Sequence, residues 1–337
     1  MSLDKSKLKK IKGDASFRSF YRKKINNINS IIVCSKKEKE KNLLIYDAIN
    51  NLLIKNKILA PKLYRENYRE NYIEIEDFGN DTIFNLLKKK GSNKVILYKK
   101  SIDLLIKIQK IKKKKTKNFK GKNYKIPIYN NSKLFAETNL FLDWYAKKYV
   151  SKKKILNFNI EMKKQIKFLL SKLKLKNNIF VHRDFHVSNL MKHKNQLATI
   201  DTQDAIIGNK AYDLASLIDD VRFKSNTKFK DNIYNYYLKL NKKYVNEVSL
   251  LNDFEVLSVL RNMKIIGIFT RLAVRDKKKR YLKLIPYTWK LIELRLKNNA
   301  IFNDLKKIMD FNFSKEVRNI KWKLILHWFY VRVMERD

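Results

Sequence analysis

The chain has 337 residues, 45% of them hydrophobic, which is enough to bury a substantial core in one large domain or two lobes. It has 77 Lys and Arg against 32 Asp and Glu, and the resulting formal charge of +45 raises nucleic acid or an anionic membrane as a partner. The lysines are dispersed and Asn and Ile are also abundant, so an A/T-rich coding composition is the plainer explanation, and no specific nucleic-acid partner is expected.

The single cysteine, Cys34, excludes a disulfide within the chain and indicates an intracellular, cytoplasmic protein. It follows an apolar run, so a buried structural thiol is expected. No apolar run approaches the roughly 18 residues of a membrane span. The amino terminus lacks the apolar core of a signal peptide, and the spacing of His and Cys matches no zinc site.

The first 80 residues predict a small β-rich lobe with one long helix. A turn at Gly13 to Ser16 precedes two apolar stretches that end at Cys34, which are typical of strands. Lys37 to Asn56 carries apolar residues near a period of 3.6, which predicts a helix. Two more strands are expected, at 63–64 and 72–76, and Asp77-Phe78-Gly79 ends the second.

From Thr82 onward the pattern is mostly helical. Helices are expected over 96–111, 134–150, 210–222, 228–246, 253–275 and 280–296. The organisation predicted is a nucleotide-binding lobe over 1–80, a catalytic and substrate lobe over 81–310, and a tail over 311–337. The aromatic segment Trp322 to Met334 is too short to span a bilayer, and a helix or strand docked on the large lobe is favoured over a membrane-surface anchor.

The stretch from Phe180 to Asp201 carries the chemistry. An apolar run leads into His182-Arg183-Asp184, Asn189 follows five residues after the aspartate, and two short apolar runs form a hairpin that ends on Asp201. Asn189 and Asp201 can supply oxygen ligands to Mg²⁺, which leaves Asp184 to accept a proton from an attacking hydroxyl. The spacing H-R-D-x-x-x-x-N is the catalytic-loop signature of protein-kinase-like folds.

Asp213 is a lone acid among apolar residues at the start of a predicted helix. We interpret it as a cap for backbone N–H groups of the catalytic loop rather than as a substrate contact.

Six segments together resemble one family: GDASFRSFYR, IEIEDFG, FLDWY, HRDFHVSNLM, TIDTQDAIIGNKAYDLASLIDD and RNMKIIGIFTRLAVRD. They are similar to the aminoglycoside-phosphotransferase-like kinases, in particular to the bacterial branch that phosphorylates N-acetylmuramate and N-acetylglucosamine at the anomeric hydroxyl. The likeness covers about residues 12–295. It implies an α+β, two-lobed, protein-kinase-like fold that uses ATP and Mg²⁺ in cell-wall sugar recycling.

Carried over by position, Asp184 matches the catalytic base, and Asn189 and Asp201 match the Mg²⁺ ligands. The nucleotide-binding residues implied are those of the phosphate-covering loop and of the hinge, whose backbone would read adenine: Gly13, Ala15, Ser16, Phe17, Glu76 and Phe78. Candidate contacts of the sugar are His186, Gln203, Asp204 and Arg271, although His186 is equally interpretable as a hydrogen-bonded loop histidine.

Two departures from the pattern stand out. Asp201-Thr202-Gln203 replaces the Asp-Phe-Gly of protein kinases, which argues against a protein kinase. The strand that should carry a phosphate-binding lysine has none, so either Lys36 or Lys37 reaches in, or the loop backbone and Mg²⁺ suffice.

Rival hypotheses follow from the same features. A catalytically weak relative acting as a nucleotide- or nucleic-acid-binding module is one alternative. A kinase of another hydroxyl substrate, such as an aminoglycoside, is the other. Aminoglycosides are polycations whose site needs converging carboxylates, so an uncharged or carboxylate-bearing amino sugar suits this basic chain better.

Overall fold

The computed structural model describes residues 8–11, 18–25, 28–297 and 299–319. The predicted loop residues Gly13, Ala15, Ser16 and Phe17 and the aromatic segment Trp322 to Met334 lie outside the described residues. The chain forms two compact units, the first made of Met1–Ile128, Lys176–Ile218 and Ser225–Lys243, the second of the remaining segments. The described helices include none that is long and apolar enough to cross a membrane.

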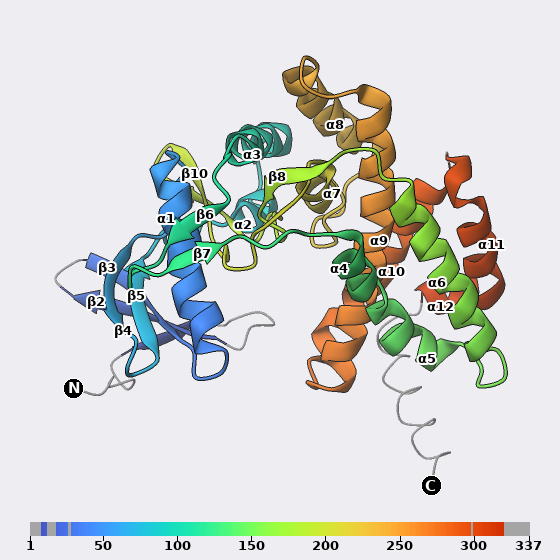
Figure 1. Cartoon of the computed structure of the whole chain (residues 1–337), viewed down its shortest axis with the longest axis horizontal. Coiled ribbons are helices and arrows are strands. Elements are labelled where there is room, and N and C mark those ends of the chain that lie inside the picture. Colours follow the sequence, from blue (N-terminus) through green and yellow to red (C-terminus); the bar gives the residue numbers. More distant parts are fainter. Residues whose placement is uncertain (1–7, 12–17, 26–27, 298, 320–337) are drawn as a thin grey trace, which may run out of the picture. The chain divides into compact units, whose positions relative to one another are not determined.

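The first unit contains an antiparallel five-stranded sheet with strand order β1-β2-β3-β5-β4 (Figure 1). The strands of this sheet are β1 (Lys9–Ile11), β2 (Ser19–Ile25), β3 (Ile28–Cys34), β4 (Leu63–Asn67) and β5 (Tyr72–Glu76). Apolar residues on one face of β3 and β5, Val33, Ile73 and Ile75, pack with Leu43 and Tyr46 of the following helix. Successive side chains of a strand point to opposite faces of the sheet, so these apolar residues bury one face of it.

The helix that packs on the sheet begins as a π-helical segment, Glu40–Ile45, and continues as α1 (Tyr46–Lys55). The helix was predicted from the 3.6-residue period, but its π-helical first segment was not. Asn50 of α1 lies 2% exposed and accepts a hydrogen bond of 2.6 Å from the hydroxyl of Thr202. The helix is thereby attached to the segment that follows Asp201.

The rest of the first unit carries the catalytic stretch. Its elements are α2 (Ile83–Lys88), α3 (Lys94–Gln109), β6 (Lys115–Lys117), β7 (Asn123–Lys125), β8 (Asn177–Val181), β9 (Leu190–His193), β10 (Gln196–Thr199), β11 (Ile206–Asn209), α7 (Ala211–Ile218) and α8 (Thr227–Asn241). Three antiparallel pairs form, β6 with β7, β8 with β11 and β9 with β10. The predicted hairpin before Asp201 is therefore confirmed.

The second unit is helical within its described residues. Its elements are α4 (Asn131–Thr138), a π-helical segment (Phe141–Ala146), α5 (Lys147–Tyr149), α6 (Ile155–Ser171), α9 (Glu247–Val274), 3₁₀ segments (Lys279–Leu284 and Ala300–Phe302), α10 (Ile285–Leu296), α11 (Asn303–Asn312) and α12 (Lys315–Asn319). Its core holds an aromatic cluster in which Phe141, Tyr145, Trp289 and Phe313 pack with ring centroids 5.3–5.8 Å apart.

Two expectations need correction. The stretch 134–150 is not one helix but α4, a π-helical segment and α5. A Cβ on Gly267 of α9 would lie 2.3 Å from the carbonyl carbon of Leu140, so α9 touches the backbone where the π segment begins.

Cys34 is half-buried rather than buried, because it is the last residue of β3. The α+β class is confirmed, and the boundary at residue 80 stays a prediction.

Candidate active site

The predicted catalytic loop follows β8 and runs from His182 to Asn189. Hydrogen bonds close it into two turns: the N–H of His186 donates to the carbonyl of Asp184 at 3.0 Å, and the N–H of Asn189 donates to the carbonyl of His186 at 2.9 Å. The side-chain amide of Asn189 donates to the carbonyl of Asp184 at 3.0 Å. The loop therefore fixes Asp184 and Asn189 relative to each other.

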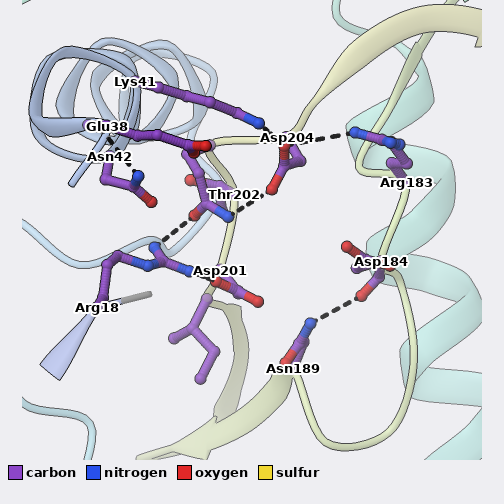
Figure 2. Close-up of polar contacts among 12 residues, drawn as sticks. Arg18, Glu38, Lys41, Asn42, Arg183, Asp184, Asn189, Asp201, Thr202 and Asp204 are labelled. Atoms are coloured by element: carbon purple, nitrogen blue, oxygen red, sulfur yellow. Dashed lines mark hydrogen bonds and ion pairs between the residues drawn. The ribbon is translucent and has the colours of Figure 1, made fainter. Parts of the chain in front are cut away.

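The β9–β10 hairpin brings Asp201 to the same place. Leu190 pairs with Thr199, and the N–H of Ile200 donates to the carbonyl of Asn189 at 3.0 Å. Asp201 follows Ile200 directly in the chain, so it lies next to the residue that is bonded to Asn189. Figure 2 shows Asp184, Asn189 and Asp201 lying around a common region. The structure thus brings together the three residues to which the sequence assigned catalysis and metal binding.

Asp213 caps this loop, as the sequence predicted. Its buried carboxylate, on α7, accepts hydrogen bonds from the N–H groups of His182 at 2.7 Å and Arg183 at 2.9 Å. Arg183 has φ of 76° and Asp201 has φ of 63°, a conformation that costs a non-glycine residue on the order of 1–3 kcal/mol. Such strain persists only where surrounding contacts impose it, and it is characteristic of functional sites.

His182 ties the loop to the hairpin. It is fully buried, and its Nε2 lies 3.1 Å from the carbonyl oxygen of Ile200. Burial lowers the pKa of His182, although the carboxylates of Asp184 and Asp201 act in the opposite direction. The lowered pKa favours a neutral imidazole at pH 7, whose Nε2–H then donates to the carbonyl.

The candidate sugar contacts Gln203 and Asp204 already have protein partners. Asp204 contacts Lys41 at 3.2 Å and Arg183 at 3.4 Å, and it accepts a hydrogen bond of 2.8 Å from Gln203 (Figure 2). Burial alone would raise the pKa of Asp204, but Arg183 and Lys41 together hold it below its usual value. His186 is only 6% exposed and lies 3.4 Å from the side-chain nitrogen of Asn189, a loop position consistent with either interpretation made from the sequence.

The predicted hinge residues belong to the first unit, whereas Arg271 belongs to the second. Glu76 ends β5, where its N–H donates to the carbonyl of Lys62 at 2.9 Å. Phe78 is 8% exposed and packs on Met191 and Ala198 of the hairpin, so its ring is a packing element, and a nucleotide contact of its backbone stays a prediction. Arg271 lies on α9 of the second unit, and its contact with a sugar stays a prediction.

The sequence pattern gave no role to the side chains of Arg18, Lys41 and Arg183. Arg18 directly precedes β2, and its guanidinium donates to the carboxylate of Asp201 and, at 2.7 Å, to the side-chain oxygen of Gln203. Lys36 and Lys37, the lysines considered from the sequence, are exposed. Nothing in the pattern singles out Arg18, because its partner lies 183 residues further along the chain.

The donor set fits Mg²⁺ bound together with a nucleotide. No cluster of three or more His, Cys, Asp or Glu side chains suited to a metal occurs in the described part of the chain. Mg²⁺ is commonly held by one or two protein oxygens plus substrate phosphates. Asp201 supplies a carboxylate, and Asn189, whose nitrogen is oriented by Asp184, has its side-chain oxygen to offer.

Comparison with known proteins agrees with the motifs. Residues 97–246 match the family described as "Phosphotransferase enzyme family". An N-acetylmuramate/N-acetylglucosamine kinase from Neisseria meningitidis serogroup B is 26% identical over 81% of this chain and 80% of its own.

Two solved structures share the fold. A choline/ethanolamine kinase family protein from Mesorhizobium loti superposes with a TM-score of 0.59 at 10% identity, covering 89% of this chain and 92% of its own. APH(2")-IIia, solved with GDP and kanamycin, has a TM-score of 0.57 at 13% identity, covering 87% and 93%. The predicted protein-kinase-like fold is confirmed, and residues 97–246 carry a domain of the phosphotransferase enzyme family, in agreement with the phosphotransferase predicted from the sequence.

Proposed function

We propose that this protein is a cytoplasmic, ATP-dependent kinase that phosphorylates an amino sugar, N-acetylmuramate or N-acetylglucosamine, at the anomeric hydroxyl, in cell-wall sugar recycling. The observation that carries the proposal is the convergence of Asp184, Asn189 and Asp201 at one loop and hairpin. The name of the relative from Neisseria meningitidis supports the sugar. Its sequence covers most of this chain.

In this mechanism, Asp184 orients the sugar hydroxyl and takes its proton as the hydroxyl oxygen attacks the γ-phosphorus of ATP, whose bond to the bridging oxygen breaks so that ADP leaves. Asn189 and Asp201 would hold Mg²⁺, and the bound ion would supply neutralisation of the nucleotide's phosphate charge. The hinge backbone at Glu76 to Phe78 would read adenine. The phosphate contacts expected of Gly13, Ala15, Ser16 and Phe17 fall outside the described residues and stay a prediction. The sugar contacts proposed are His186, Gln203, Asp204 and Arg271.

Local charge supports an uncharged or acidic sugar over an aminoglycoside. The carboxylates of Asp201 and Asp204 are already paired with Arg18, Lys41 and Arg183. A polycationic substrate needs unpaired carboxylates that converge on its amines, and the cations here would repel it. An acetamido sugar, or one that carries a carboxylate, avoids this repulsion.

The test is a substrate panel with purified full-length protein and Mg-ATP, measured as ADP release. N-acetylglucosamine and N-acetylmuramate should release ADP, and phosphorus NMR should identify a phosphate on the anomeric carbon. The methyl glycoside of N-acetylglucosamine is the matched control, because its anomeric oxygen is blocked, and it should give no turnover. Turnover of kanamycin alone would contradict the proposed substrate, and equal turnover of the methyl glycoside would contradict the proposed position.

A further inference from the structure

Arg18 is a buried cation bonded directly to the proposed metal ligand. Its side chain is 3% exposed, and one end of the guanidinium donates to Oδ1 of Asp201. The other end donates to Gln203 at 2.7 Å. Figure 2 shows the side chain reaching from the start of β2 to the segment of Asp201.

Aromatic rings hold the guanidinium in place. It lies 5.3 Å from the ring centroid of Phe20 and 5.7 Å from that of Tyr46, distances at which a cation is attracted to a ring face. Burial raises the pKa of Tyr46 to about 12, so the phenol stays neutral at physiological pH. The partner with a formal negative charge in this set is therefore Asp201.

A divalent cation on Asp201 competes with Arg18 for the same carboxylate. Two cations at one carboxylate repel each other, and a buried guanidinium that gives up a bonded carboxylate loses a stabilising anion, which is costly. The phosphates of a Mg-bound nucleotide would arrive with the metal and offer that anion. An arginine fork suits phosphate oxygens well, because it presents several donors in fixed directions.

We propose that Arg18 is the phosphate-binding cation of this site: it neutralises Asp201 while the metal is absent, and it transfers its donors to the nucleotide phosphates when Mg-nucleotide binds. The inference rests on the proposed function. It also gives the site a phosphate-binding cation, although β3 carries no lysine and Lys36 and Lys37 are exposed. Metal and nucleotide would thus bind together more favourably than the metal binds alone.

The proposal predicts opposite effects on two ligands when the charge is removed. In Arg18→Gln the dissociation constant for Mg–AMP-PNP should rise by about 10- to 100-fold, because a charge-assisted phosphate contact is lost. The dissociation constant for Mn²⁺ alone, a spectroscopically visible oxygen-seeking ion, should fall by about threefold or more, because a competing positive charge leaves Asp201. Arg18→Lys keeps the charge and should lie between wild type and Arg18→Gln for both ligands.

The experiment measures nucleotide binding by calorimetry and Mn²⁺ binding by electron paramagnetic resonance. Lys23→Gln is the matched control: Lys23 lies on β2, the strand that Arg18 directly precedes, and pairs with Glu74 at 3.1 Å, and the substitution removes the same charge. Both of its dissociation constants should stay within about twofold of wild type, because its partner Glu74 takes no part in the proposed metal and nucleotide contacts.

A purely structural Arg18 would lower the melting temperature while leaving both dissociation constants unchanged, and that result overturns the inference. A decrease in Mn²⁺ affinity in Arg18→Gln overturns it as well. If Arg18→Gln fails to fold, Arg18→Lys decides, and wild-type affinity for both ligands in that variant counts against the proposal. If the wild-type protein binds neither nucleotide nor Mn²⁺, the proposed function fails as well. If the wild type binds both ligands and only the Arg18 variants depart from the prediction, the inference about Arg18 alone fails.

Discussion

The cap on the catalytic loop gives a quantitative prediction. In Asp213→Asn one side-chain oxygen becomes an amide nitrogen, which cannot accept a hydrogen bond. One of the two N–H groups, that of His182 or that of Arg183, therefore faces a donor in a fully buried environment. The substitution preserves shape, removes the charge and one acceptor, and puts an N–H donor in the place of that acceptor.

The magnitude follows from those contacts. A hydrogen bond to a charged acceptor contributes about 1.5–3 kcal/mol, and a buried donor left without an acceptor costs about 1–3 kcal/mol. We expect the free energy of unfolding to fall by about 2–4 kcal/mol, since the two figures overlap in part. Arg183, held at φ of 76°, should then relax, and Asp184 follows it directly in the chain. The turnover number should fall by about 10- to 100-fold with the loop misplaced.

Asp253→Asn is a matched control for this prediction. Asp253 is also fully buried, and its two oxygens accept hydrogen bonds from the N–H groups of Lys174 at 2.7 Å and Leu175 at 2.8 Å, within the second unit. Urea unfolding should show similar losses of stability in both variants, whereas turnover at a temperature where both are folded should fall only in Asp213→Asn. Equal turnover in the two variants, or an unchanged unfolding free energy in Asp213→Asn, would refute the reasoning.

Three further outcomes are expected. Asp201→Ala should weaken Mg-dependent nucleotide binding more than Asn189→Ala, measured by calorimetry, because a carboxylate is the stronger ligand for a hard cation; equal losses would contradict this ranking. Burial raises the pKa of Asp47 to about 6, so the folded state disfavours its charged form, and this cost develops as pH rises above about 4 and is complete above about 6. Asp47→Asn, which cannot ionise, should therefore raise the unfolding free energy by about 1–3 kcal/mol at pH 8 and leave it unchanged at pH 3.5, and the same gain at both pH values would count against a titration. Nucleic acid should bind weakly, without sequence preference, and binding should fall steeply as salt rises; an oligonucleotide preferred at physiological salt would favour the binding-module alternative.

The sequence predicted the parts of the site that lie close together along the chain. Asp184, Asn189 and Asp201 fall within one loop and hairpin, so their spacing and the apolar runs around them were enough to place them. The cap by Asp213 was also predictable, because a lone acid at the start of an apolar helix needs hydrogen-bond donors and nearby backbone N–H groups supply them.

Contacts between distant segments could not be predicted. Arg18 is one of many basic residues, and its pairing with Asp201 depends on how β2 is set against the hairpin. The pairing of Lys41 with Asp204 likewise depends on the π-helical start of the helix at Glu40, which no periodicity signals. Local patterns specify elements, whereas ion pairs of this kind are specified by packing.

The central claim, that Asp184 is the base of a sugar kinase, is tested most directly by Asp184→Asn. The measurement pairs sugar-dependent ADP release, with N-acetylglucosamine or N-acetylmuramate, with calorimetric binding of Mg–AMP-PNP by the same preparation. We predict that turnover falls by about 10²–10⁴-fold while nucleotide affinity stays unchanged, since the carboxylate acts on the acceptor hydroxyl. Turnover within a few-fold of wild type, with nucleotide binding intact, would contradict the account.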